Sequence, residues 1–249
     1  MRPYDRAPHL FLGFPTRYNE RRWSPAFDAL PDPAHRRARM RFSPRFGTAL
    51  TDGQFMTSRD GRTFHHWDET FLRPGPERRD NWVYGDGYQS LGLLETAAED
   101  LTAPPELSIY VGENQWKGPT RLRRYTLRID GFVALHARRK PGELLTKPFV
   151  FRGRALSLNF ATSAAGSLRV EIDDLAGRPV PGFARADCDE VFGDSLDRAV
   201  TWKGSSDLGR LAGKPVRLRV AMSDADLFSF QFVDRESAAR RIPRGGLHP

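Results

Sequence analysis

The C-terminal half of the sequence alternates apolar and polar residues in short runs that are separated by glycine-containing turns. In the run LRVEI at 168–172, the leucine, valine and isoleucine share one face of an extended chain, and the arginine and glutamate share the other. Successive side chains of a strand point to opposite faces, so a period of two predicts a strand with one buried face. The run VRLRV at 216–220 repeats the pattern. These runs restrict the chain to an antiparallel β-structure.

Such runs follow one another at nearly even spacing from about residue 127, whereas the first half is less regular. Short strands at even spacing with turn residues between them are typical of an antiparallel sandwich. We therefore predict two all-β domains, at 1–126 and 127–235, followed by a frayed tail at 236–249. Between the strands of the first domain, residues 19–46 form a polar insertion rich in proline and arginine, in which a short helix at 32–41 is compatible with the pattern.

Hairpin patterns organise the rest of the first half. A strand is expected at 9–18, two strands about a turn at 49–75, and a further pair at 87–96 and 106–116. Within 49–75, Asp60-Gly61 is typical of a type I′ turn, whose two central residues need positive φ. An aspartate in such a turn accepts local backbone hydrogen bonds, so we interpret it as structural. The adjacent histidines 65 and 66 would point to opposite faces of a strand, which disfavours a shared metal site.

Charge and composition exclude several classes of function. The formal net charge is +8, but 34 arginines against 5 lysines are scattered among 31 acids, which does not favour nucleic-acid binding. The single cysteine, Cys188, cannot form an intrachain disulfide, and no apolar run approaches the length of a membrane span or a signal peptide. We expect no metal, no cofactor and no membrane contact. As given, the chain is expected in the cytoplasm, unless an export signal precedes Met1.

Two aromatic and acidic stretches in the first domain predict a ligand site. The stretch NWVYGDGYQS at 81–90 combines rings, an aspartate and glycines, and YVGENQW at 110–116 places acidic, amide and indole groups where a strand ends. Aromatic faces stack on the apolar side of a sugar ring, and carboxylates bind its hydroxyls. Glycosidases use two carboxylates, and we assign these catalytic roles to Glu113 and Asp86. The predicted substrate-binding residues are Trp82, Tyr84, Tyr88, Asn114, Trp116, Arg17, Tyr18 and Asp52.

Structural alternatives stand beside each of these assignments. Asp86 would belong to a glycine-rich turn and Glu113 would cap a hairpin. In the second domain, the aspartates at 173–174 and 224–226 are either calcium ligands or turn residues. Cys188 is interpreted as a semi-buried thiol, and Trp202 as a core residue or a carbohydrate platform.

The second half resembles the C-terminal sandwich of bacterial proteins described as similar to glycoside hydrolase family 32. The resemblance lies in GELLTKPFVFRG, LSLNFATSAAGSLRVEIDDLAGRPVPGF, GDSLDRAVTWKG and LAGKPVRLRVAMSDADLFSFQF. In the first half, FLGFPTRY, TDGQFMTSRDGRTFHHWDETFLRPG, NWVYGDGYQSLGLLET and ELSIYVGENQW resemble the last blades of the five-bladed β-propeller of that group. The resemblance implies a propeller followed by a jelly-roll-like sandwich, and hydrolysis of O-glycosidic bonds.

The chain departs from that pattern in its first half. Four strands per blade would require about 250–300 residues for five blades, whereas 1–126 suffices for about two. The motifs W-[MQ]-N-D-P-[NQ]-G, R-D-P and E-C are absent, since Arg59-Asp60 is followed by glycine. The resemblance thus implies a fragment that is truncated at its N-terminus and inactive alone. An open half-propeller exposes a sheet edge, so we expect an oligomer or a missing N-terminal segment. The alternative is a non-catalytic carbohydrate-binding or structural interaction module.

Overall fold

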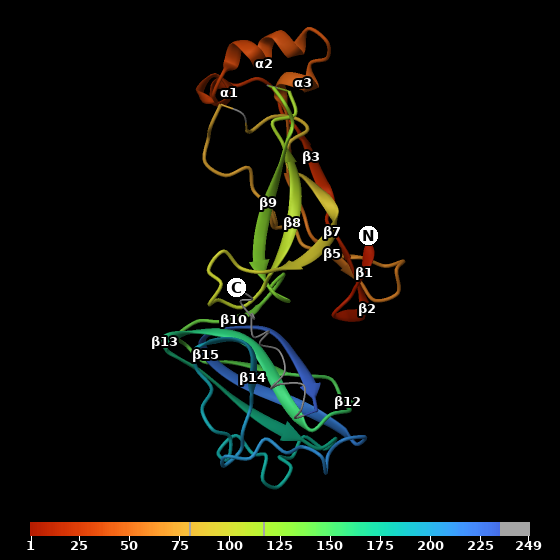
Figure 1. Ribbon diagram of the computed structural model, residues 1–249, viewed down its shortest axis with the longest axis vertical. Coiled ribbons are helices and arrows are strands. Elements are labelled where there is room, and N and C mark those ends of the chain that lie inside the picture. The colour runs from red at the N-terminus through yellow and green to blue at the C-terminus, as the bar shows by residue number, and fades with distance from the viewer. Residues whose placement is uncertain (80, 117, 235–249) are drawn as a thin grey trace, which may run out of the picture. The chain divides into compact units, whose positions relative to one another are not determined.

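The computed structural model describes residues 1–79, 81–116 and 118–234, and the predicted tail at 236–249 lies outside these residues. The chain divides into two compact units, Met1–Leu127 and Arg128–Pro249, which are described separately (Figure 1). The predicted all-β class is confirmed, since 47% of the residues are in strands and 7% in helices. In the described part of the chain, no helix has the length and apolar character needed to span a membrane.

The first unit contains short strands in three separate sheets. Its strands are β1 (Arg2–Tyr4), β2 (Ala7–Gly13), β3 (Thr16–Glu20), β4 (Ala49–Gly53), β5 (Met56–Ser58), β6 (His65–His66), β7 (Tyr88–Thr96), β8 (Glu106–Glu113) and β9 (Arg121–Arg128), which ends at the first residue of the second unit. Their order is β1-β2-β5-β6 in one sheet, β3-β4 in a second and β7-β8-β9 in a third. The predicted pairing of 87–96 with 106–116 is confirmed by the antiparallel ladder between β7 and β8.

The strand predicted at 9–18 is interrupted at Phe14 and Pro15, so that its two parts belong to different sheets. Proline has no backbone N–H and cannot continue the ladder. The carbonyl of Pro15 instead accepts hydrogen bonds from the backbone N–H of Gln54, at 2.8 Å, and from the side-chain amide of Gln89, at 3.3 Å. The break therefore connects β3 and β4 to the other two sheets.

The polar insertion folds into three helices between β3 and β4. These are α1 (Pro25–Ala29), α2 (Pro33–Met40) and α3 (Arg45–Thr48), which Figure 1 shows grouped together near one end of β3 and β8. The helix predicted at 32–41 corresponds to α2, whereas α1 and α3 were not predicted. The carboxylate of Asp32 accepts a hydrogen bond from the backbone N–H of His35 at 3.4 Å, and Pro33 occupies the first turn, as in many helix N-termini.

The turn between β5 and β6 differs from the predicted type I′ hairpin. Gly61 has a φ of 69°, but Asp60 is not in the positive-φ region, and the connection is longer than two residues. As predicted, Asp60 is structural, because its Oδ1 accepts hydrogen bonds from the backbone N–H groups of Arg62 and Thr63 at 2.8 and 2.7 Å. The hydroxyl of Ser58 also donates to Asp60, at 2.9 Å. Side-chain capping of the longer loop replaces the tight turn.

The hydrogen bonds to Asp60 lead to a pH prediction. Three hydrogen bonds lower the pKa of Asp60 from 3.8 to about 2. The largest effect comes from the backbone N–H of Thr63, followed by the backbone N–H of Arg62 and the hydroxyl of Ser58. Because the folded-state pKa is the lower one, this stabilisation is complete above the ordinary pKa and is lost as the pH falls toward about 2. We expect NMR titration to find the low pKa. The Asp60→Asn variant keeps the acceptor oxygen and should lack this acid-dependent loss of stability. A normal pKa for Asp60 would contradict the prediction.

The second unit is built on two long antiparallel strands. Its strands are β10 (Leu135–Ala137), β11 (Gly142–Leu145), β12 (Phe149–Val150), β13 (Ala155–Asp173), β14 (Asp194–Ala199) and β15 (Pro215–Val233). The central β13 and β15 pair with each other, β14 pairs with β13, and β10, β11 and β12 pair with successive parts of β15. The register shift between Thr162 and Ser167 is an irregularity within one strand, because β15 continues beside it without a break.

The core of the second unit lies on one face of these long strands. Leu168, Val170 and Ile172 are fully buried, as the alternation predicts. The same core includes Leu156, Leu158 and Phe160 of β13 and Val216, Leu218, Val220, Met222, Ala225 and Leu227 of β15. Part of the segment 174–214 packs against this face through buried side chains that include Cys188 and Trp202. The indole of Trp202 donates to the carbonyl of Val170 at 3.0 Å, so Trp202 is a core residue rather than a platform for sugar.

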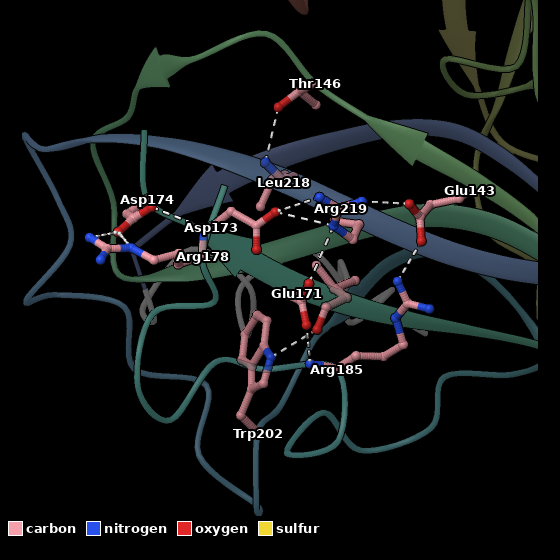
Figure 2. Close-up of polar contacts among 11 residues, drawn as sticks. Glu143, Thr146, Glu171, Asp173, Asp174, Arg178, Arg185, Trp202, Leu218 and Arg219 are labelled. Carbon is pink, nitrogen blue, oxygen red and sulfur yellow. Dashed lines mark hydrogen bonds and ion pairs between the residues drawn. The ribbon is translucent and has the colours of Figure 1, made fainter. Parts of the chain in front are cut away.

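A network of charged side chains surrounds Arg219 in the second unit (Figure 2). Arg219 on β15 contacts Glu143 on β11 at 2.6 Å, and Glu171 and Asp173 on β13 at 3.3 and 3.1 Å. Arg185 lies in the segment 174–214, where its backbone N–H donates to Glu171 and its guanidinium donates to Glu143. Arg219 thus occupies the centre of this acidic cluster.

The two pairs of aspartates considered as calcium ligands have protein partners instead. Asp173 binds Arg219, and Asp174 accepts a hydrogen bond from the backbone N–H of Arg178 at 3.0 Å in a hairpin turn. Asp224 and Asp226 contact the hydroxyl of Ser163 and the imidazole of His136. No group of three or more acidic, histidine or cysteine side chains that could hold a metal ion occurs among the described residues.

Candidate functional site

Three acidic residues from distant parts of the first unit line one small cavity. Asp52 comes from β4, Asp86 from the loop before β7, and Glu113 from the end of β8. The cavity has a volume of about 20 Å³, which is room for a single water molecule. The structure therefore brings together three of the predicted site residues, including both candidate catalytic carboxylates.

Asp52 is held by Arg17 on the neighbouring strand. The two residues are opposite each other in the antiparallel ladder of β3 and β4. The guanidinium of Arg17 makes a bidentate contact with the carboxylate, with Nη2–Oδ2 at 2.6 Å and Nε–Oδ1 at 3.0 Å. The hydroxyl of Thr70 donates to Oδ2 at 3.2 Å. Cross-strand pairing thus neutralises the charge of Asp52 at the edge of the cavity.

Asp86 is positioned by a glycine-containing loop that is tied to β4. The Thr51 hydroxyl donates to the carbonyl of Asp86 at 2.5 Å and accepts from the backbone N–H of Gly85 at 3.1 Å. The Asp86 carboxylate accepts from the backbone N–H of Gln115 at 3.0 Å. Gly85 and Gly87 have φ values of 93° and 78°, a region that other residues rarely adopt. The glycines allow the loop to turn the Asp86 side chain toward the end of β8.

Glu113 is buried and surrounded by donors that were not predicted. Its Oε2 lies 3.0 Å from Nη2 of Arg78 and 3.1 Å from Nε of Arg123, and the hydroxyl of Tyr125 donates to Oε1. Burial and the hydrogen bond to Glu113 raise the pKa of Tyr125. Arg123 and Tyr125 are two residues apart in β9, so strand alternation places them on one face, a signal that sequence analysis overlooked.

Aromatic rings gather beside these carboxylates. The ring of Tyr84 stacks on Phe46 with a centroid separation of 5.7 Å and on Trp116 at 6.5 Å, and it meets the edge of Tyr18 at 5.7 Å. Burial, and then the neighbouring Tyr84, raise the pKa of Tyr88. We call these five residues the aromatic cluster. Tyr18 and Tyr88 are each 43% exposed and Trp116 is 39% exposed, so the cluster presents aromatic surface to solvent.

Besides the paired Arg17 and Asp52, two predicted binding residues lie outside the aromatic cluster. Trp82 packs against the small core formed by Phe27, Leu30 and Leu50, and its indole donates to the carbonyl of Gly75 at 2.9 Å. Asn114 is buried with a φ of 64° and donates to the carbonyl of Pro119 at 3.2 Å. The structure gives both residues roles in local folding. Phe46, by contrast, belongs to the cluster but was not predicted, because it lies in the polar insertion.

Arginines of the insertion pack against the aromatic cluster. The guanidinium carbon of Arg39 lies 4.1 Å from the ring centroid of Trp116, and that of Arg45 lies 5.5 and 5.6 Å from those of Phe46 and Tyr84. Arg39 is only 6% exposed, and its Nε and Nη2 atoms are buried without a hydrogen-bond partner. Burial, and then the charge of Arg36, lower the pKa of Arg39 to about 10.

Arg36 and Arg39 are buried in different ways. Arg36 donates to the backbone carbonyls of Trp82 at 2.7 Å and Asn81 at 3.4 Å, so its guanidinium has acceptors. For Arg39, stacking on Trp116 and Phe46 contributes about 2 kcal/mol or more, whereas burial of a charge without an ion-pair partner costs several kcal/mol. The charge of Arg39 is therefore only partly compensated within the described residues.

A comparison of the chain with family models, curated proteins and solved structures gives no match. The functional argument therefore depends on the arrangement of the side chains described above.

Proposed function

We propose that the chain is a carbohydrate-active protein that binds a saccharide on the first unit, at the aromatic cluster and the adjoining carboxylates. The observation that carries this proposal is the convergence of Asp52, Asp86 and Glu113 on one cavity beside partly exposed rings. Asp86 connects the two features, because it binds the backbone of Gln115, next to Trp116, and follows Tyr84 by two residues.

Each part of this surface suits a sugar. The rings of Tyr84, Tyr88 and Trp116 offer flat apolar faces for the C–H side of a pyranose. Carboxylates and the guanidinium of Arg17 offer acceptors and donors for hydroxyl groups at fixed positions. Stacking supplies binding energy, and the polar groups select the orientation of the ring.

The resemblance to glycoside hydrolases extends the proposal to hydrolysis. Asp86 and Glu113 would then be the pair of carboxylates that glycosidases need, about 5–5.5 Å apart in retaining and about 6.5–9.5 Å apart in inverting enzymes. In the same proposal, the sheets β1-β2-β5-β6 and β7-β8-β9 are blades of a partial propeller, and the second unit is the sandwich that follows it.

Binding without hydrolysis is the second candidate, and the surroundings of Glu113 favour it. Arg78, Arg123 and Tyr125 already contact its carboxylate, and the cavity admits only a water-sized group. A general acid must instead reach the glycosidic oxygen directly or through one water. Under this candidate, Glu113 organises the site and the rings bind the sugar.

A glycan array followed by calorimetry tests the proposal. We expect the Trp116→Ala variant to bind the array's best glycan about tenfold more weakly, because aromatic stacking is lost. Phe42→Ala is the matched control, since Phe42 is 85% exposed and is not part of the aromatic cluster. If the chain binds no glycan, or if the two variants weaken binding equally, the proposal is wrong.

Release of reducing ends from the bound glycan separates the two candidates. Hydrolysis requires that both Asp86→Asn and Glu113→Gln lower the rate by at least about 100-fold while the glycan still binds. Binding with no release of reducing ends supports the non-catalytic candidate.

A further inference from the structure

The positive charges around the proposed sugar site differ in whether they have a counter-ion. Arg17 is paired with Asp52, and Arg78 and Arg123 are paired with Glu113. Arg39 and Arg45, by contrast, form no ion pair within residues 1–79, 81–116 and 118–234, where their contacts are with rings. Of these five arginines, the two without an ion pair are thus the two that pack on the aromatic cluster.

Arg39 has donors that nothing in the described chain accepts. It lies on the buried side of α2, its Nε and Nη2 atoms have no hydrogen-bond partner, and Trp116 covers its guanidinium. Buried charges in proteins are normally paired and hydrogen-bonded. The depressed pKa of Arg39 has the same origin, because burial and the like charge of Arg36 both disfavour its charged form. An anion at this position would accept hydrogen bonds from the two donors and would favour the charged form of Arg39.

We propose that the saccharide is anionic, and that its carboxylate or sulfate group pairs with Arg39 and Arg45 while its ring stacks on the aromatic cluster. This inference rests on the proposed function of the same site. A guanidinium matches the two oxygens of such a group in a bidentate contact. Because Trp116 lies over Arg39, the anion reaches Arg39 when the indole moves aside.

The distribution of charge favours an acidic sugar over a nucleic acid. A single-stranded nucleic acid needs a positive groove that follows several phosphates. Here Arg17, Arg78 and Arg123 are neutralised by Asp52 and Glu113, so the two arginines on the aromatic cluster suit one anionic group.

Calorimetry with matched probes tests the inference. The probes are a trimer of galacturonic acid, its methyl ester, a sulfated heparin disaccharide and a short oligothymidylate. We expect the acid trimer or the sulfated disaccharide to bind at least about tenfold more tightly than the ester, and the stronger of the two identifies the anionic group. Raising the salt from about 0.05 to about 0.3 M should weaken this binding.

Substitutions on α2 and α3 locate the anion. Arg39→Gln and Arg45→Gln should each remove most of the preference for the charged probe over the ester. Arg37→Gln should preserve it, because Arg37 is exposed, stacks on Trp23 and pairs with Asp28. A fluorescence change on binding that is absent in Trp116→Phe would report the movement of the indole.

The outcomes separate this inference from the proposed function. Equal binding of acid and ester overturns the inference but leaves saccharide binding intact. Binding of none of the sugars, to a chain that also binds no glycan on the array, overturns both. Tighter binding of the oligothymidylate overturns the assignment of a saccharide.

The stability of the ligand-free protein provides a readout that does not depend on the probe. Arg39→Met keeps an extended apolar side chain and removes the unpaired charge, so it should raise the Tm of the first unit by a few degrees. A lower Tm would show that Arg39 stabilises the fold by itself and would contradict an external counter-ion.

Discussion

Replacing Arg219 by methionine is expected to lower the free energy of unfolding of the second unit by about 3 kcal/mol at neutral pH. Asp173 is completely buried, and Arg219 is the charged partner of its Oδ2, while its Oδ1 is buried without a hydrogen-bond partner. Glu143 and Glu171 contact the same guanidinium. Methionine fills similar space but leaves three acidic groups together without their central cation. Urea unfolding of both proteins at about pH 7 measures the loss.

The loss in free energy of unfolding caused by Arg219→Met should be smaller at acid pH. Burial raises the pKa of Asp173, so the folded chain takes up this proton at higher pH than the unfolded chain, and ionisation of Asp173 reduces stability as the pH rises. Removing Arg219 raises this pKa further. The hydrogen bond from Arg219 lowers the pKa of Glu143, and the stability that this provides to the wild type is lost as the pH falls. Because of both effects, the free energies of unfolding of wild type and variant should differ less near pH 4 than near pH 7.

Arg178→Met is the matched control for this prediction. Arg178 and Asp174 form an ion pair four residues apart at the surface, with the arginine side chain 78% exposed. Exposed pairs contribute about 0.5 kcal/mol or less. If Arg219→Met and Arg178→Met had equally small effects, or if the deficit of Arg219→Met grew in acid, the network would not stabilise the fold in the way described.

Replacing Thr51 by valine is expected to destabilise the first unit by about 2 kcal/mol and to weaken saccharide binding. The Thr51 hydroxyl is buried and joins β4 to the loop through the carbonyl of Asp86 and the N–H of Gly85. Valine has the same shape but cannot hydrogen-bond, so both loop groups lose a buried partner. Because this loop carries Tyr84 and Asp86, the loss should reach the proposed site. Thermal unfolding and glycan calorimetry measure the two effects.

Thr57→Val provides the comparison for Thr51→Val. Thr57 lies on β5 and is half-buried, and its hydroxyl has no hydrogen bond with another described side chain or backbone group. This variant should change both stability and binding little, because a strand tolerates valine well. An unchanged affinity in a destabilised Thr51→Val protein would show that the loop does not position the site.

The local pattern of residues was sufficient to predict the parts of the fold that depend on strand alternation. The all-β class, the pairing of β7 with β8 and the buried face of β13 follow from a period of two, because a shift of one residue would expose the apolar side chains. The irregularity between Thr162 and Ser167 does not follow from the local pattern, since the sequence does not reveal that β15 runs unbroken beside it.

At the candidate site, the sequence by itself identified the glycine-rich loop with Tyr84 and Asp86 and the end of β8 with Glu113. Only the tertiary structure determined that Arg78 and Arg123 contact Glu113, and that Phe46 and Arg39 pack on Trp116. The physical reason is that strand periodicity depends on neighbouring residues. The partner of a buried charge depends instead on which segments pack together, and here a polar insertion lies against loops more than thirty residues away.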